Sequence, residues 1–263
     1  MNVVLIVGAG AVENAWHPVV RAINKTFDVE TDVDGANFLL ARSICVLKFY
    51  AEVASSGKYI EMFAGMKRDI SIVKKYISQE LKEAQQGGEI KVRSEFKQIL
   101  DKFVTNDIRN KAWLVSTNWD EVVDDEINKL YQSNNPDNTK VKCFHLHGSF
   151  RCPENMYLPS EITGEIYRTK IEKIEIANEH SIVMDMLNHA DRVILYGLSL
   201  DPLDAELNQT LYSGWLSNNI KEIIVINPEH NKVAKRVKLL LDKEFPVNVI
   251  GVCPSNLNEK FEY

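Results

Sequence analysis

Six short apolar runs, each bounded by turn residues or charges, most constrain what this chain can fold into. They are aliphatic or β-branched and apolar on both faces, which is typical of parallel strands covered by helices on both sides. The runs are residues 2–7, 112–116, 141–146, 192–196, 222–226 and 247–252. Helical patterns lie between several of them, at 120–131, 182–189, 203–216 and 232–243. This alternation predicts an α/β fold with a Rossmann-like parallel sheet of about six strands flanked by helices.

Residues 35–110 break the alternation, because they contain three helical patterns and no clear strand. Residues 38–53 are apolar nearly all round, so this helix is expected to be buried or to lie in an interface. Residues 61–86 form an amphipathic pattern, and Ser94 is expected to cap a third helix. We interpret this region as a helical insertion between the first and second strands. Residues 150–180 are predicted to form loop and short helix.

Composition and charge exclude several classes of function. The 263 residues suffice for a single domain over 1–263, and the net charge of −6 leaves no basic footprint for nucleic acid. No two of the four cysteines are spaced as a CxxC pair, which predicts no metal site. No apolar stretch is long and uncharged enough for a membrane span. The apolar run that opens the chain leads directly into glycines, so we expect a strand there instead of a leader, and a cytoplasmic protein.

Polar clusters follow five of the apolar runs, where the predicted strands end. Parallel strands point the same way, so their carboxyl ends line one crevice and can converge on one ligand. The clusters are Gly8-Ala9-Gly10, Ser116-Thr117-Asn118-Trp119-Asp120, His145-Leu146-His147-Gly148-Ser149, Tyr196-Gly197-Leu198-Ser199-Leu200-Asp201-Pro202-Leu203-Asp204 and Ile226-Asn227-Pro228. The first lacks the third glycine of a dinucleotide fingerprint, because Glu13 stands there, which argues against a hydride-transferring dehydrogenase.

These motifs, in this order, resemble the NAD-binding motifs of sirtuins. The matching segments are Gly8-Ala9-Gly10, Thr117-Asn118-Trp119-Asp120, His147-Gly148, Gly197-Leu198-Ser199 and Ile226-Asn227. The chain is more similar to the bacterial sirtuin-like NAD hydrolases of anti-phage defence than to the deacylases, since Trp16 and a helical insertion follow the glycine turn. Residues 149–191 contain only Cys152, so the four-cysteine zinc module of the deacylases is missing.

The resemblance implies that NAD is the substrate and that the bond between nicotinamide and ribose is cleaved. It assigns Asn118 to the ribose and the attacking water, and His147 to general-base catalysis. It places Gly8, Ala9 and Gly10 against the pyrophosphate. The other cofactor-binding residues that it implies are Thr117, Asp120, Gly197, Ser199, Asp204 and Asn227.

Structural roles compete with several of these assignments. Asn118 and Asp120 also fit a helix cap, and Asp204 either caps a helix or reaches the ligand. His145 and His147 alternate along a predicted strand and are expected to share a face; His145 is interpreted as structural. Trp119 is interpreted as a packing residue, and the lone Glu13 and His17 as surface or loop residues.

The sequence therefore predicts an NAD glycohydrolase, with a defence effector that depletes NAD as its role. An NAD-dependent deacylase or ADP-ribosyltransferase and a non-catalytic sensor of NAD or ADP-ribose remain alternatives. A toxic NAD hydrolase must be restrained, so we expect a regulatory partner subunit or a homo-oligomer. The apolar segment 38–53 motivates that expectation, although the rest of the chain could equally cover it.

Overall fold

A central parallel sheet organises the protein. The computed structural model describes residues 1–54, 57, 59–105, 107, 110–132, 143–217, 219–241 and 246–257. The sheet has six strands in the order β5-β4-β1-β6-β7-β8, and every pairing in it is parallel. The strands are β1 (Asn2–Val7), β4 (Lys111–Ser116), β5 (Cys143–His145), β6 (Arg192–Tyr196), β7 (Glu222–Ile226) and β8 (Asn248–Val252). The predicted α/β fold is confirmed.

Strand β1 is buried in the middle of the sheet, and later strands are added on both of its sides. The chain first builds outward through β4 and β5, and then returns to the other side of β1 to place β6, β7 and β8. In open α/β sheets, ligands bind outside the carboxyl ends of the strands at such a switch point. The topology therefore places a crevice where β1 and β6 end.

Helices cover both faces of the sheet, as the apolar runs predict. Alternate β1 residues face opposite ways: Val3, Leu5 and Val7 join one core cluster, while Val4 and Ile6 join the other. The first cluster packs against α1 (His17–Phe27), α5 (Val122–Gln132) and the helices of the 35–110 region. The second packs against α6 (Lys170–Asn188), α7 (Ala205–Gly214) and α8 (His230–Leu240).

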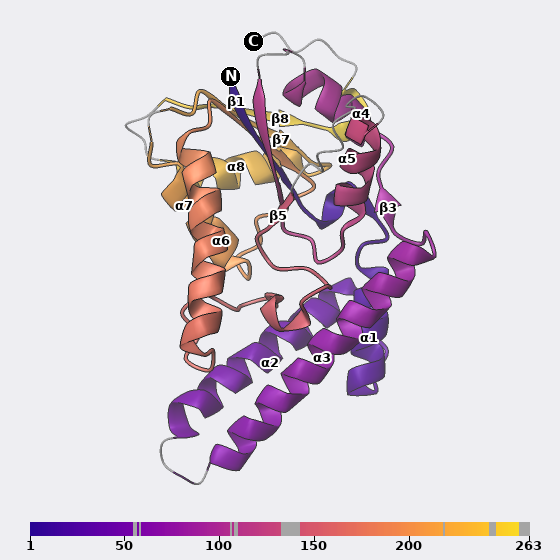
Figure 1. The fold of residues 1–263 in the computed structure, drawn as a ribbon, viewed down its shortest axis with the longest axis vertical. Helices are drawn as coiled ribbons and strands as arrows, with labels where there is room; N and C mark the ends of the chain where they lie inside the picture. The colour runs from indigo at the N-terminus through magenta and orange to yellow at the C-terminus, as the bar shows by residue number, and fades with distance from the viewer. Residues whose placement is uncertain are drawn as a thin grey trace.

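The segment between β1 and β4 is largely helical. Two long helices, α2 (Val33–Val53) and α3 (Ile60–Gln86), pack together and extend away from the sheet, at the bottom of Figure 1. One side of α2 is buried, as at Leu40 and Ile44, whereas Phe38 is 64% exposed and Phe49 is 59% exposed. Among the described residues, the helix with apolar residues nearly all round is therefore covered on one side and leaves Phe38 and Phe49 exposed. No helix in the described parts of the chain is both long and apolar enough to cross a membrane.

The structure corrects the sequence predictions at several element boundaries. Glu95 precedes α4 (Phe96–Ile99), so Ser94 does not cap it, and a turn of π-helix, η3 (Leu100–Val104), continues it. A two-residue strand, β3 (Lys91–Val92), lies in the region expected to lack strands and pairs with β2 (Val12–Glu13). Helix α6 begins at Lys170, within the stretch expected to be loop and short helix. Predicted positions 141–142 and 242–243 lie outside the described residues.

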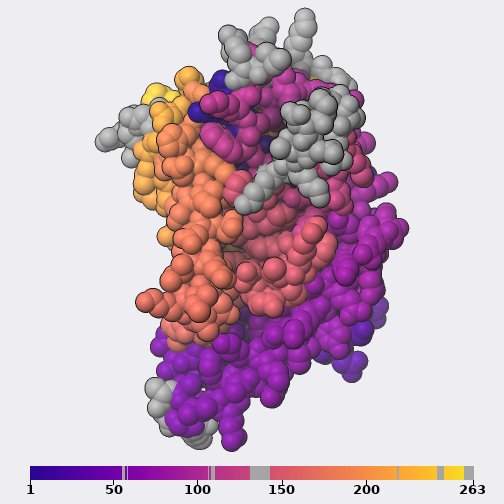
Figure 2. Space-filling view, in the orientation of Figure 1, coloured from indigo at the N-terminus to yellow at the C-terminus, as the bar shows by residue number. Residues whose placement is uncertain are grey.

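A buried charge cluster joins the helical region to the loop that precedes α6. Lys74 of α3 donates to both carboxylate oxygens of Glu161, at 3.0 and 3.2 Å, and to the Met156 carbonyl at 2.6 Å. Arg168 and Tyr167 donate to the same carboxylate, at 3.0 and 2.9 Å. In Figure 2 the surface of this loop lies between α6 in orange and the α2–α3 pair in purple. The cluster therefore fixes one wall of the region next to the crevice.

Glu161→Ala should destabilise the protein by about 3–5 kcal/mol, because it leaves two buried cations without their anion. Urea unfolding followed by circular dichroism measures this change in the free energy of unfolding. The matched control is Glu175→Ala on α6, where the glutamate is exposed, and we expect its effect to stay within about 0.5 kcal/mol. Equal stabilities for the two variants would show that the cluster does not hold the loop.

Candidate functional site

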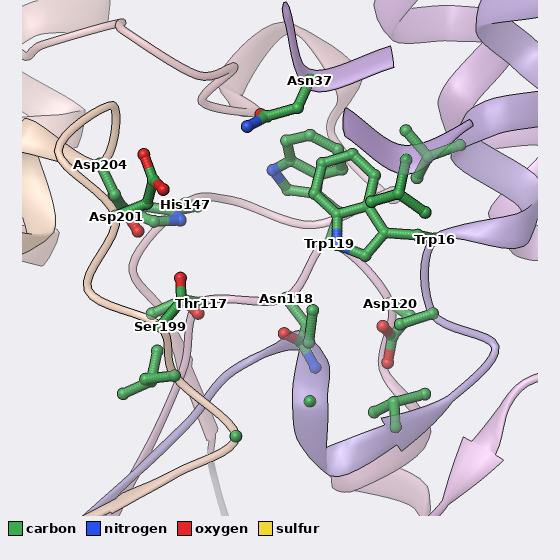
Figure 3. Close-up of a pocket in the computed structure, with 18 of the residues that line it drawn as sticks. Trp16, Asn37, Thr117, Asn118, Trp119, Asp120, His147, Ser199, Asp201 and Asp204 are labelled. Atoms are coloured by element: carbon green, nitrogen blue, oxygen red, sulfur yellow. The ribbon is translucent and has the colours of Figure 1, made fainter. Parts of the chain in front are cut away.

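A cavity of about 960 Å³ opens at the carboxyl ends of the sheet strands. Its walls come from the loops that follow β1, β4, β5, β6 and β7, and from the start of α2 (Figure 3). Ten of the eleven residues that the sequence assigns to the site line it. They are Ala9, Gly10, Thr117, Asn118, Asp120, His147, Gly197, Ser199, Asp204 and Asn227.

The eleventh residue, Gly8, lies behind the cavity wall, where two glycine turns are in close contact. A Cβ atom on Gly10 would lie 2.8 Å from the Gly197 carbonyl oxygen, and one on Gly197 would lie 2.2 Å from the Ala11 nitrogen. Gly197 also has a φ of 70°, which disfavours any side chain. The amides of Gly8 and Gly10 donate to the carbonyls of Tyr196 and Gly197. These glycines therefore allow two loops to meet. Of the three residues expected to face a pyrophosphate, Gly8 and Gly10 have amides that are already engaged.

Asn118 lines the cavity and carries a buried acceptor that is not used. Its side chain is buried, and its Nδ2 donates to the Gly8 carbonyl at 3.3 Å. Its Oδ1 has no hydrogen-bond partner among the described residues. A buried carbonyl oxygen without a partner costs free energy, which a ligand hydroxyl or a water molecule would recover by donating to it. The amide nitrogen is thus held by the protein, while the amide oxygen has no partner among the described residues.

His147 forms an ion pair with Asp204 across the cavity wall. Its Nε2 lies 3.1 Å from the Asp204 Oδ1. Burial disfavours the charged imidazolium, but attraction to Asp204 and the hydrogen bond between them outweigh that effect, so the pKa of His147 is raised. Asp204 stands at the N-cap position of α7, yet its side chain makes no cap hydrogen bond. Of its two expected roles, the structure therefore favours the one at the cavity.

Asp120 is a buried carboxylic acid in the cavity lining. Its carboxyl is buried and accepts a hydrogen bond from the Val122 amide at 3.2 Å, so it holds the start of α5. Burial raises its pKa to about 6, because the charged form loses hydration. Asp120 thus combines the loop-holding role with a carboxyl group that titrates near neutral pH.

The remaining assigned residues divide into free and engaged side chains. Asn227 donates to the Leu198 carbonyl at 2.8 Å and accepts from the Glu229 amide at 2.7 Å, so its side chain mainly holds its own loop. Thr117 donates to the Val7 carbonyl at 3.3 Å. Ser199 is exposed at the cavity and offers its hydroxyl to a ligand.

The structure also places the residues for which structural roles were expected. Trp119 packs edge-on against Trp16, with ring centroids 6.3 Å apart, and both line the cavity. His17 lines the cavity as well, whereas Glu13 pairs with Lys91 at 3.2 Å. Strand β5 ends at His145, so the alternation that would put His147 on the same face is interrupted. His145 bonds to Asp124 of α5 instead of facing the cavity.

Sequence reasoning missed the cavity residues that come from between β1 and β4. Arg93 follows β3 and donates from Nε to the Gly10 carbonyl at 2.8 Å, which brings its guanidinium to the glycine turn. The β2–β3 pairing that places it is two residues long on each strand, too short to leave a periodic pattern. Asp34 and Asn37 reach the cavity from the first turns of α2. A helical pattern predicts such residues but not which of them face a ligand.

A second set of polar groups lies behind His147. Tyr157 bonds to Thr163 at 2.9 Å, and Thr163 donates in turn to Glu206, which lines the cavity. His180 bonds to Thr210 at 2.9 Å and lies near Tyr157 in a tilted arrangement, with ring centroids 5.5 Å apart. Burial lowers the pKa of His180 to about 4, so its ring is neutral at cellular pH. These groups support the cavity wall without adding a cation to it.

No protein-family model and no curated protein matches this sequence. The cavity and its side chains must therefore carry any statement about what the protein does.

Asp204→Asn should lower the pKa of His147, because the favourable charge is removed while the burial remains. The raised pKa means that the pair stabilises the fold below the unfolded-state pKa of about 6.5 and loses this contribution as the pH rises through the folded value. A nuclear magnetic resonance titration of the His147 ring measures the shift. Asp185→Asn, beside the exposed His189, is the control and should leave the pKa of His147 unchanged. An unchanged or higher pKa in Asp204→Asn would contradict the pairing.

Proposed function

We propose that the protein is an NAD glycohydrolase, which cleaves the bond between nicotinamide and ribose to give nicotinamide and ADP-ribose. One observation carries the proposal: Asn118, whose Oδ1 has no partner among the described residues, lines the same cavity as the His147–Asp204 pair. An open amide acceptor suits a ribose hydroxyl or a water molecule, and a histidine held by a carboxylate suits proton transfer. The ordered motifs that resemble those of sirtuins supply the identity of the substrate.

The chemistry needs few groups. The glycosidic bond breaks with its electron pair going to the pyridinium nitrogen, so nicotinamide leaves neutral and the ribose becomes an oxocarbenium ion. Water adds to the anomeric carbon, and neutral His147 accepts the proton that the water loses. Asn118 would hold the ribose or this water through Oδ1. We therefore expect the rate to rise as the pH increases through the raised pKa of His147.

The charges around the cavity suit a reaction in which positive charge moves from the pyridinium ring to the sugar. Carboxylates outnumber arginines in the described lining, and they favour the oxocarbenium ion that forms on the ribose. The acidic lining residues are Asp34, Glu95, Asp120, Glu161, Asp201, Asp204, Glu206 and Glu229. Arg93, beside the glycine turn, is the arginine of the described lining, and we propose that it binds the pyrophosphate.

We also propose that the activity is controlled by assembly, with a partner subunit or a second copy of the chain, in a role of depleting NAD during defence. Phe38 and Phe49 support this idea, because both remain exposed on α2. Light scattering coupled to size-exclusion chromatography tests it. A fully active, stable monomer would refute control by assembly and leave the proposed reaction standing.

Asn118→Ala and His147→Ala should each reduce NAD turnover by at least about 100-fold, because each removes a group that acts on the ribose, the water or its proton. Incubation with NAD followed by chromatography measures nicotinamide and ADP-ribose. The control is His189→Ala, where the histidine is exposed at the C-cap of α6, and it should keep wild-type turnover.

Each outcome of this assay separates the candidate functions. Wild-type turnover in either purified, folded cavity variant would rule out the assigned mechanism. Tight binding of NAD without products would favour the non-catalytic sensor. Release of nicotinamide only when an acylated peptide is added would favour the deacylase.

A further inference from the structure

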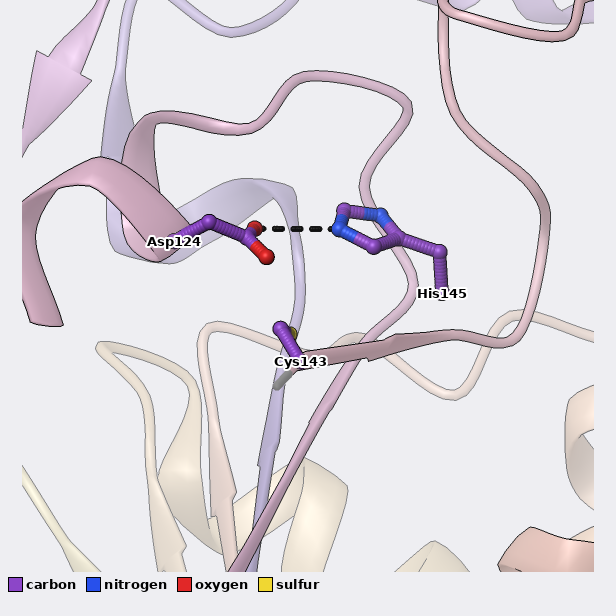
Figure 4. Close-up of side chains that lie close together, drawn as sticks. All are labelled: Asp124, Cys143 and His145. Carbon is purple, nitrogen blue, oxygen red and sulfur yellow. Dashed lines mark hydrogen bonds and ion pairs between the residues drawn. The ribbon is translucent and has the colours of Figure 1, made fainter. Parts of the chain in front are cut away.

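A histidine outside the cavity is hydrogen-bonded to the main chain of Asn118. His145 lies at the end of β5, and its Nδ1 is 3.1 Å from the Asn118 carbonyl oxygen. Its Nε2 is 3.0 Å from Oδ2 of Asp124, in the first turn of α5 (Figure 4). The ring thus bridges the loop after β4 and the helix that follows that loop.

The two partners of His145 determine how its ring is protonated. A backbone carbonyl only accepts hydrogen bonds, so Nδ1 must carry a proton. Nε2 has the Asp124 carboxylate as its partner, so both ring nitrogens are engaged at the same time. Burial disfavours the charged ring, but the hydrogen bond and attraction to Asp124 outweigh that effect and raise the pKa of His145. With both nitrogens bonded, the ring holds its two partners in a single geometry.

This restraint acts on Asn118, which is also held at two other points. Its backbone amide donates to the Ser116 hydroxyl at 3.1 Å, and its side-chain amide donates to the Gly8 carbonyl. The hydrogen bond from His145 fixes the third polar point, the carbonyl. With these three points held, the unpartnered Oδ1 of this cavity-lining residue has a defined position.

We propose that His145 is a positioning residue: with Asp124 it holds the main chain of Asn118 so that Oδ1 meets the ribose or the attacking water. The proposal rests on the proposed hydrolysis of NAD, and it assigns His145 no contact with substrate. Misplacement of a positioned group by about 1 Å can cost about 100-fold in rate, so loss of this restraint should lower kcat.

A matched pair of variants separates the two hydrogen bonds of the ring. In His145→Asn, the amide nitrogen replaces Nδ1 and keeps the bond to Asn118 while losing Asp124. In His145→Gln, the longer side chain replaces Nε2 and keeps the bond to Asp124 while losing Asn118. We expect His145→Asn to retain kcat within about threefold of wild type and His145→Gln to lose about 10- to 100-fold, with KM little changed in both.

Thermal unfolding of both variants gives the control for a merely structural role. Similar melting temperatures with unequal kcat values support positioning. Equal losses of kcat in the two variants, or a loss that follows stability alone, would overturn it. His189→Gln, at an exposed site on α6, should match wild type in every measurement.

A readout without turnover separates this proposal from the proposed function. The chemical shifts of the Asn118 side-chain amide and the Trp119 backbone amide should match wild type in His145→Asn and differ in His145→Gln. If the wild-type protein releases no nicotinamide, the hydrolase proposal fails, while these shifts still decide the positioning. Unchanged shifts in His145→Gln would refute it.

The same side chains include a possible set of metal ligands, which the test also resolves. Ligand atoms of Asp124, Cys143 and His145 lie within 4.8 Å of one another. An ion bound there would coordinate Nε2 in place of the hydrogen bond to Asp124, and removal of that ion should abolish activity. The contrary outcome is stoichiometric zinc in the purified protein, with turnover that is lost on adding a chelator and restored by Zn²⁺. That result would show that these side chains form a metal site and not a hydrogen-bonded bridge. Full activity of metal-free protein supports the bridge.

Discussion

The close contact between the glycine turns after β1 and β6 is the constraint on which the site depends. The two strands are neighbours at the switch point, and Gly10 and Gly197 approach so closely that neither has room for a Cβ atom. The amide of Gly10 donates to the Gly197 carbonyl, so the contact is also a hydrogen bond. The Gly8 carbonyl, in the same turn, then receives the Asn118 side chain. Backbone packing at the centre of the sheet therefore determines where the amide of the site can be.

The helical region completes the cavity from the other side. Helix α3 is joined to the loop before α6 through Lys74 and Glu161, both buried. Tyr157, from the same loop, accepts the Trp119 indole N–H at its carbonyl and lines the cavity with its ring. An ion pair far from the sheet thus supports an aromatic wall of the site. Since breaking a buried pair is costly, the wall should be rigid as long as the helices remain packed.

The sheet and most of the site could be predicted from the sequence because both follow from strand periodicity. Once six runs are apolar on both faces, they form parallel strands, and the polar residues at their ends must meet. The residues that escaped prediction depend on other signals. The start of α6 carries a capping box, Thr169 with Glu172, which marks the boundary that the apolar pattern missed. Arg93 depends on a pairing of two residues, and no periodicity reveals that.

The partners of the two neighbouring histidines could not be read from their spacing. His147 pairs with Asp204, which is 57 positions later, and His145 pairs with Asp124, which is 21 positions earlier. Both carboxylates raise the pKa of their histidine, but only the first pair borders the cavity. The second acts on the carbonyl of Asn118, behind the cavity wall. The segment at the end of β5 therefore places one imidazole at the cavity, and the other is bonded to the loop after β4. The sequence motif is shared, and the division of roles comes from the helices packed on either side.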